Sequence, residues 1–208
     1  MFGDPVTNPK GWETIRFEDI VANTQLGLVR NSSQQNDELK YPYVKMNNIV
    51  STGRLDLTKM VYVDATEKEA AAYCLKKGDF LFNTRNSREL VGKTAVYREN
   101  GIHLYNNNIM RILFNTKTVP DYVNHLFQTN KIQFELEAIK SGTISVFAIY
   151  YKNLSQIPIL LPPLSLQYKF AALVEKVEAM RAKQRATEQE LENLFQSLMQ
   201  RAFKGELV

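Results

Sequence analysis

Residues 165–203 read SLQYKFAALVEKVEAMRAKQRATEQELENLFQSLMQRAF. The stretch contains no proline or glycine and is rich in alanine, leucine, glutamate, glutamine, lysine and arginine. These six residue types favour the α-helix most strongly, whereas proline and glycine interrupt it. The sequence therefore predicts one continuous helix from about Ser165 to Phe203.

Along this helix, seam residues recur in alternating steps of three and four, which places them on one face and is typical of a coiled coil. Most are apolar, and the two in the middle are polar. The series comprises Phe170, Leu173, Val177, Met180, Gln184, Thr187, Leu191, Leu194 and Leu198. The alternative is an amphipathic helix packed on its own domain, but so long a seam favours a partner helix.

The charges of the helix favour antiparallel pairing of two identical copies. Basic residues precede the polar middle and acidic residues follow it, namely Arg181, Lys183, Arg185, Glu188, Glu190 and Glu192. Only antiparallel pairing brings the basic patch of one helix against the acidic patch of the other. The matching register places Leu173 opposite Leu198, Val177 opposite Leu194, Met180 opposite Leu191 and Gln184 opposite Thr187. We therefore expect a homodimer.

Upstream of the helix, short β-type and helical patterns alternate and predict a mixed α+β domain. The β-type runs are YPYVKM (41–46), MVYV (60–63), DFLFN (79–83), KTAVY (93–97) and IMRILF (109–114). Thr66 and Glu69 form a capping box for one helix. Ile132, Leu136 and Ile139 share one face of another. The segment before Trp12 has turn-rich pairs and is expected to be extended.

Prolines mark the end of this domain. Pro158 and then Pro162-Pro163 predict a stiff extended linker, because proline lacks the N–H that a sheet ladder needs. We therefore expect a globular domain over residues 1–163 and a dimerisation helix over residues 164–208.

Composition limits the possible classes. The 208 residues are 44% hydrophobic, enough for one domain with an appendage. The single cysteine, Cys74, excludes an internal disulfide and a multi-thiolate metal site. No signal-peptide core or membrane-spanning run is present, so we expect a cytoplasmic protein without a membrane partner.

Charge is compatible with a polyanionic partner without requiring one. The formal net charge is +4. Between Lys76 and Arg98, six basic residues stand against two acidic ones. A cluster this mild is usually a solvated surface, and nucleic-acid contact is the alternative that charge alone leaves open.

Motifs for catalysis are lacking, and we expect neither an enzyme, a metal nor a cofactor. Gly92-Lys93-Thr94 ends like a phosphate-binding loop, but Ser87 stands where that loop needs a glycine. His103 and His125 are isolated and fit no zinc pattern. Glu38-Leu39-Lys40 has no acidic partner of the kind a nuclease site needs.

Four segments resemble the specificity subunits of type I restriction-modification systems. They are YVKMNNIVSTGRLDL (43–57), LKKGDFLFNTRNSRELVGKTAVY (75–97), NLSQIPILLPPLSLQ (153–167) and LFQSLMQRAFKGEL (194–207). The resemblance covers essentially the whole chain. One departure is Leu166, where the family usually has glutamate before the glutamine, so a contact made by that carboxylate is not expected here.

The resemblance implies a target recognition domain followed by a conserved-region helix. It implies double-stranded DNA as target, and a modification subunit and a restriction subunit as partners. S-adenosylmethionine would belong to the modification subunit. A complete family member resembles two such units in tandem and here there is one, so we expect a natural half-subunit, a shortened gene product or a fragment.

Polar loops held on strands are the candidates for DNA contact, because arginine pairs well with guanine and asparagine with adenine in the major groove. Two loops stand out, Asn83, Thr84, Arg85, Asn86, Ser87 and Arg88 in the first and Lys140, Ser141, Thr143 and Ser145 in the second. Further candidates are Lys45, Asn47, Asn48, Arg54, Lys93, Asn106, Asn107 and Asn108. The alternative function is a structural or regulatory coiled-coil protein that does not recognise DNA.

Overall fold

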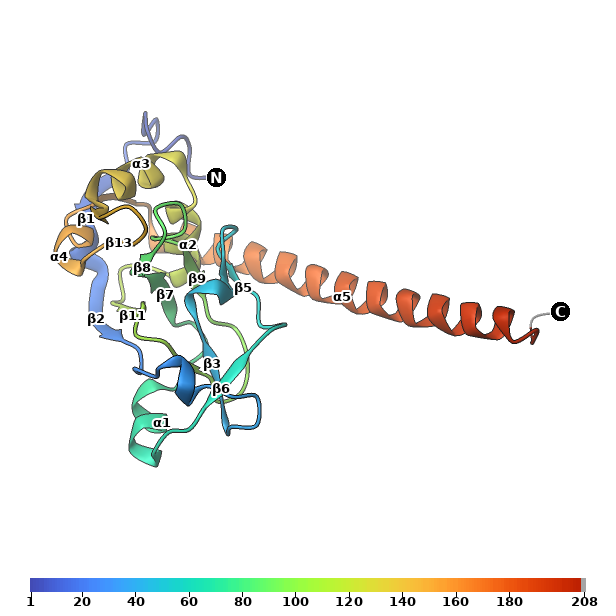
Figure 1. Cartoon of the computed structure of the whole chain (residues 1–208). Helices are drawn as coiled ribbons and strands as arrows, with labels where there is room; N and C mark the ends of the chain where they lie inside the picture. The colour runs from blue at the N-terminus through green and yellow to red at the C-terminus, as the bar shows by residue number, and fades with distance from the viewer. Residues whose placement is uncertain (207–208) are drawn as a thin grey trace. The chain divides into compact units, whose positions relative to one another are not determined.

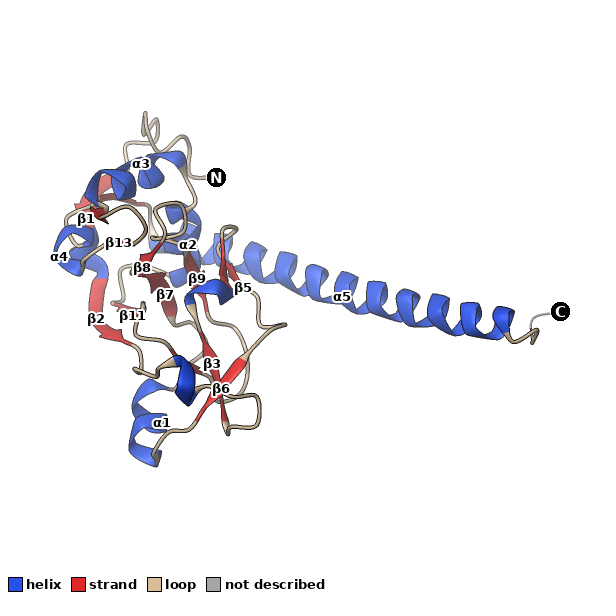
Figure 2. Ribbon diagram, viewed as in Figure 1, coloured by secondary structure: helices blue, strands red, loops and turns tan. Residues whose placement is uncertain are grey.

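The computed structural model describes residues 1–206, so the last two residues of the expected helical segment, Leu207 and Val208, lie outside it. The chain divides into two compact units, one spanning Met1–Gln167 and the other beginning at Tyr168. Figure 1 labels the elements of both, and Figure 2 shows that the first unit mixes helices and strands whereas the second is helical. The expected α+β class is confirmed.

A four-stranded antiparallel sheet forms the centre of the first unit. Its order is β2 (Val21–Leu26), β11 (Ile109–Phe114), β7 (Phe80–Asn83) and β9 (Thr94–Val96). The strands predicted at 79–83, 93–97 and 109–114 are thereby confirmed. Every residue of β7 is buried, because both faces of the sheet are covered.

Alternate residues of β7 enter different clusters, as the two-residue period of a strand requires. Phe80 and Phe82 pack with residues of α2 (Pro120–Phe127) and α3 (Asn130–Ile139), whereas Leu81 packs in a second cluster with Tyr97. The predicted face of α3 is confirmed for Ile132 and Leu136, which are buried.

A second sheet has the order β10 (Leu104–Tyr105), β3 (Tyr41–Val44) and β6 (Val61–Val63). Next to it lies α1 (Glu67–Tyr73), capped by Thr66 and Glu69 as predicted. Three short 3₁₀ turns, η1 (Phe17–Ile20), η2 (Ser32–Gln34) and η3 (Met46–Asn48), and the small hairpin of β4 (Ile49–Val50) and β5 (Arg54–Leu55) connect these layers.

A third sheet is small and has the order β12 (Ser141–Gly142), β13 (Phe147–Ala148) and β8 (Arg85–Asn86). The short helix α4 (Tyr151–Leu154) follows β13. In Figure 1, α3 and α4 lie at one end of the first unit and α1 at the other.

The prediction of an extended linker from Pro158 onward is wrong for residues 158–161. Residues 158–161 form β14 (Pro158–Leu161), which pairs antiparallel with β1 (Glu13–Arg16). Proline is accommodated because it is the first residue of an edge strand, where a missing N–H leaves no ladder bond unmade. Only Pro162 and Pro163 separate this strand from the final helix.

The long helix is confirmed. It is α5 (Leu164–Phe203), starting one residue earlier than predicted. Its first turn belongs to the first unit, where the fully buried side chain of Gln167 forms four hydrogen bonds. Its oxygen accepts from the Thr118 hydroxyl at 2.8 Å and the Val119 N–H at 3.0 Å. Its amide nitrogen donates to the Pro162 carbonyl at 2.8 Å and the Lys117 carbonyl at 3.3 Å.

Candidate nucleic-acid interface

The two polar loops singled out in the sequence are joined by the third sheet. Strand β8, in the first loop, pairs with β13, which follows the second, so that Arg85 lies opposite Ala148 and Asn86 opposite Phe147. The Ile149 N–H extends this pairing by donating to the Thr84 carbonyl at 2.9 Å. Segments some sixty residues apart in the sequence thus form one surface.

The asparagine run 106–108 adjoins the same surface. The Thr84 N–H and hydroxyl both donate to the Asn108 carbonyl, at 2.8 and 2.9 Å. The Asn106 side chain is buried, and its oxygen accepts from the Asn108 N–H at 2.7 Å, which fixes the turn. Asn107 and Asn108 are partly exposed at the surface.

A cavity of about 410 Å³ opens between these segments. Its wall combines hydrogen-bonding and apolar groups from four parts of the first unit, namely Thr24, Leu26, Thr84, Arg85, Asn107, Asn108, Met110, Ala148, Ile149, Tyr150 and Tyr151. Arg85 is exposed and forms no ion pair with any residue that the structure describes. A free guanidinium beside amide side chains is suited to bind phosphate or the edge of a base.

Sequence reasoning missed Thr24, Leu26 and Tyr150 in this wall. The first two lie on β2, whose approach to the loop depends on the order of the sheet. Tyr150 is 56% exposed and is followed by Tyr151. Two aromatic residues a few positions after a polar loop are a signal that could have marked the position, because an exposed aromatic ring offers an apolar face for stacking.

The side chains of Arg88 and Lys140 form hydrogen bonds with other residues of the first unit. Arg88 Nε donates to Glu137 Oε1 at 2.7 Å, and Lys140 Nζ donates to Glu137 Oε2 at 2.7 Å and to the Arg88 carbonyl at 2.5 Å. The hydrogen bonds from Lys140 and Arg88 hold the pKa of Glu137 below its usual range. The Lys140 side chain is only 10% exposed, whereas that of Arg88 is 59% exposed. Arg88 therefore keeps open donors, and Lys140 has few.

Three other predicted residues also have structural partners. Asn83 is fully buried and donates to the Leu90 carbonyl at 3.0 Å, while its side-chain oxygen has no hydrogen-bond partner among residues 1–206. Asn48 is buried and donates to the carbonyls of Asp56 and Lys59. The Lys93 ammonium donates to the Met46 and Ile49 carbonyls, and its burial lowers its pKa.

The remaining candidates are at least partly exposed. Lys45 Nζ donates to Gln35 Oε1 at 2.9 Å, and Arg54 Nε donates to the Thr52 hydroxyl at 3.2 Å. Asn47, Ser141, Thr143 and Ser145 are exposed, and Asn86 and Ser87 partly so. Met46, next to Asn47, accepts a long contact from Asn108 Nδ2 at 3.9 Å, which brings this turn near the asparagine run.

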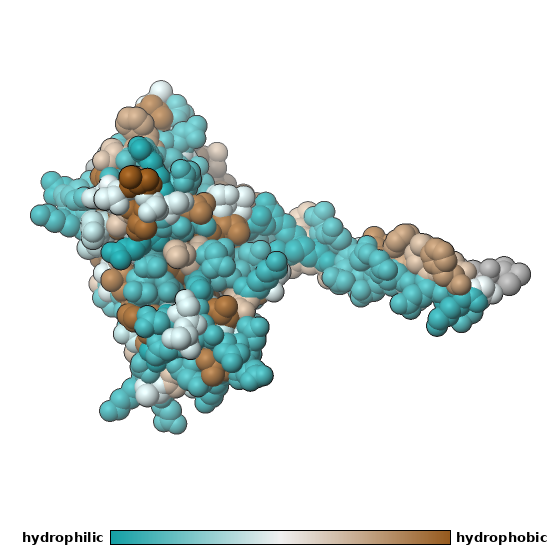
Figure 3. Space-filling model, in the orientation of Figure 1, coloured by the Kyte–Doolittle hydropathy of each residue, from teal (hydrophilic) through white to brown (hydrophobic). Residues whose placement is uncertain are grey.

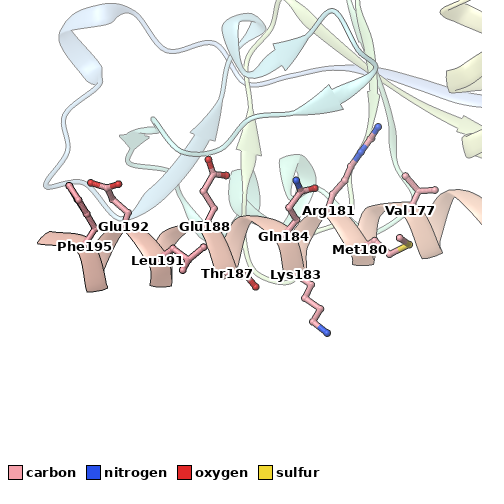
Figure 4. Close-up of a pocket in the computed structure, with 10 residues that line it drawn as sticks. All are labelled: Val177, Met180, Arg181, Lys183, Gln184, Thr187, Glu188, Leu191, Glu192 and Phe195. Atoms are coloured by element: carbon pink, nitrogen blue, oxygen red, sulfur yellow. The ribbon is translucent and has the colours of Figure 1, made fainter. Parts of the chain in front are cut away.

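The second unit presents the predicted seam along α5. Leu173, Val177, Met180, Leu191, Leu194 and Leu198 are between 39% and 71% exposed. Figure 4 shows side chains along the middle of the helix, where Arg181 and Gln184 are followed by Glu188 and Glu192.

The apolar surface widens toward the end of α5. Phe195, Met199 and Phe203 are exposed beside the predicted seam, at 55%, 38% and 85%. In Figure 3, apolar residues gather along one side of this part of the helix. The predicted seam did not include these three residues, because the alternation of three and four steps selects only the narrowest stripe.

Two further findings concern metal binding and membrane spans. Within residues 1–206, no three histidine, cysteine, aspartate or glutamate side chains are grouped closely enough to hold a metal ion. The helices in the same range include none with the length and apolar character that a membrane span requires.

A mixed α+β domain is followed in the sequence by one long helix. Comparison with known proteins identifies the class of protein that has this arrangement. The type I restriction modification DNA specificity domain matches residues 9–193. A putative type I restriction enzyme MjaX specificity subunit of Methanocaldococcus jannaschii is 30% identical over 169 residues, which are 80% of this chain and 39% of that protein. The EcoKI specificity subunit of Escherichia coli K12 is 26% identical over 207 residues, 94% of this chain and 43% of that protein.

A solved structure agrees at the level of the fold. The HsdS subunit from Thermoanaerobacter tengcongensis aligns with a TM-score of 0.54 at 23% identity, covering 96% of this chain and 46% of that one. The chain belongs to the type I restriction-modification DNA specificity family. It spans less than half the length of the relatives it matches.

Proposed function

We propose that this chain is a non-catalytic specificity subunit that recognises a DNA sequence through the surface formed by residues 83–88, 106–108 and 141–150. The observation that carries the proposal is the match of the specificity domain over residues 9–193, which includes these loops and most of α5. The geometry supports it, because Arg85, Asn107 and Asn108 line one cavity and extend from hydrogen-bonded strands and turns. Rigid positioning of such groups is what recognition of base edges needs.

We further propose that two copies pair through α5 in antiparallel orientation. The support is the exposed seam, the polar middle of Gln184 and Thr187, and the separation of basic from acidic residues along the helix. A dimer of this kind has two-fold symmetry, so its two recognition domains would bind inverted copies of one half-site separated by unrecognised bases.

In this assignment the chemistry belongs to other subunits. A modification subunit would carry S-adenosylmethionine and methylate the site, and a restriction subunit would join for cleavage. The wide apolar end of α5 supports a further helical partner, because Phe195, Met199 and Phe203 extend beyond a two-helix seam. DNA recognition by this chain would thus direct the partner enzymes to a bipartite site.

Selection of duplexes from a randomised library by the full chain, followed by titration of the enriched duplex at two salt concentrations, tests the proposal. The expected result is one enriched bipartite sequence with inverted halves, bound more weakly at the higher salt because counterions are released on phosphate contact. A chain that dimerises in light scattering yet enriches no sequence would instead be a structural or regulatory coiled-coil protein.

A further inference from the structure

The hairpin of β12 and β13 ends in a loop, residues 143–146, that presents a fully exposed apolar side chain at its tip. Ile144 is fully exposed, and Val146 is 49% exposed. Thr143 and Ser145, on either side of Ile144, are exposed as well. An isoleucine in water adds nothing to the core of the unit, so packing gives no reason for its presence at this position.

The base of this hairpin is held in place although its tip is exposed. A Cβ atom on Gly142 would lie 2.3 Å from the Val146 carbonyl oxygen, so the close approach of the two strands requires glycine here. The Thr143 N–H donates to the Val146 carbonyl at 3.2 Å and closes the loop. The Arg88 guanidinium lies 5.6 Å from the centre of the Phe147 ring. The tip is thus carried on a defined support.

The surroundings of the tip match the chemistry of a DNA groove better than that of a protein contact. Strand β13 is hydrogen-bonded to β8, which carries the unpaired Arg85. The hydroxyl groups of Ser141, Thr143 and Ser145 surround Ile144 in the sequence. Donors of this kind bind phosphate and sugar oxygens, and a single apolar side chain among them can enter between base pairs. A protein-docking surface would be expected to offer a continuous apolar patch.

We propose that Ile144 inserts between two adjacent base pairs and unstacks them when the chain binds DNA. This inference rests on the DNA recognition proposed above and adds a residue and a mode of selection to it. Pyrimidine–purine steps unstack most easily, so the half-site should contain a TA or CA/TG step where Ile144 enters. That step would be selected by its deformability, without a hydrogen bond to either base pair.

Fluorescence of 2-aminopurine tests the insertion directly, because this base brightens when it is unstacked. The probes are copies of the duplex that the wild-type chain enriches from the randomised library, each carrying 2-aminopurine at a different adenine position. The full chain is used without any other subunit, so that methylation chemistry cannot produce the signal. Ile144→Ala removes the inserting side chain, and Ile144→Leu keeps an apolar one. Ile102→Ala is the matched control, because Ile102 is likewise an exposed isoleucine, at 54%, but lies outside the proposed surface.

Wild-type protein should brighten the probe at one step of each half-site. Ile144→Ala should lose more than half of that signal and lower the affinity on the order of tenfold. Ile144→Leu should resemble wild type, Ile102→Ala should change neither quantity, and all three variants should melt at the wild-type temperature because both sites are exposed.

Three results would overturn the insertion. If Ile144→Ala leaves fluorescence and affinity unchanged, the insertion is wrong while the proposed DNA recognition stands. If both readouts persist but the variant loses retention of a modification subunit, the hairpin is a protein contact. If the wild-type chain enriches no sequence from the library, the proposed function itself fails and the insertion fails with it.

Discussion

At the scale of single residues, two arginines of the same loop have different environments. Arg85 is exposed and unpaired within the part of the chain that the structure describes, whereas Arg88 bonds to Glu137 and faces the Phe147 ring. Both fit the same sequence pattern for DNA contact. Only the structure separates a side chain that is free to bind a ligand from one that also stabilises the loop.

Arg85→Ala should therefore weaken DNA binding by about 1–3 kcal/mol with an unchanged melting temperature. Arg88→Ala should lower both the affinity and the melting temperature, since it also removes the contacts to Glu137 and Phe147. Titration of the enriched duplex at two salt concentrations, combined with thermal melting, measures both effects. Arg16→Ala is the control, because Arg16 is exposed on β1 and, within residues 1–206, forms an ion pair only with Glu18. An Arg85→Ala variant that binds like wild type at both salts would remove Arg85 from the interface.

At the scale of elements, the start of α5 is stabilised by a residue that the sequence analysis did not single out. Gln167 is fully buried and both ends of its amide are used, with the oxygen accepting two bonds and the nitrogen donating two. One of the two donors to the oxygen, the Val119 N–H, directly precedes α2, so this side chain ties the first turn of α5 to the N-terminus of α2.

Gln167→Ala should destabilise the first unit by about 3 kcal/mol, because it leaves several buried polar groups without partners. Gln167→Glu should be at least as harmful, since a carboxylate oxygen would then face the Pro162 and Lys117 carbonyls. Chemical denaturation measures both free energies of unfolding. Gln196→Ala should change stability by less than about 0.5 kcal/mol, because Gln196 is exposed and its side chain bonds to Glu192 on the surface of the helix. Equal stability of the Gln167 variants and wild type would contradict the anchoring role.

Elements with a strong local pattern could be predicted from the sequence, and those that depend on distant pairing could not. The capping box of Thr66 and Glu69 and the periodicity of α5 are local signals, and both elements were found as predicted. Strands β8, β12 and β13 have only two residues each, too few to show a period. Their pairing, which brings the two loops together, therefore emerged only in three dimensions, and so did the burial of Asn48 and Asn83.

The seam of α5 also makes a prediction at this scale. If α5 pairs as proposed, replacing Leu191 and Leu194 with glutamate should leave the chain monomeric, because each charge would face an apolar residue, Met180 or Val177, of the partner helix. Light scattering measures the mass, and circular dichroism should show that the first unit remains folded. The double substitution Gln189→Glu and Gln196→Glu adds equal charge at exposed positions off the seam and should leave the dimer intact. Dimers that survive the leucine substitutions would place the interface elsewhere.

At the scale of the whole molecule, the proposed assembly separates two tasks. The loops of the first unit would select bases, and α5 would set the distance between two recognition domains in an antiparallel dimer. The family match covers residues 9–193, so it includes both the first unit and most of α5. The length of α5 then becomes a variable that can be changed without altering the loops.

Duplicating residues 178–184 directly after Gln184 inserts one heptad and preserves the seam. The insertion should lengthen each helix by about 10.5 Å, at roughly 1.5 Å per residue. Since duplex DNA rises about 3.4 Å per base pair, the gap between half-sites should grow by about three base pairs, while the half-sites themselves stay the same. The added base pairs also rotate one half-site about the DNA axis by nearly a third of a turn, so weaker binding or bent DNA is expected as well.

Selection from a library with randomised half-sites and variable gaps reports both quantities in one experiment. Inserting only four residues at the same place is the matched control, because it interrupts the heptad and should impair dimerisation rather than shift the gap. A longer gap with unchanged half-sites would support α5 as the spacer. Altered half-sites at the original gap would mean that the helix itself contributes to base recognition, because the loops of the first unit are identical in the two proteins.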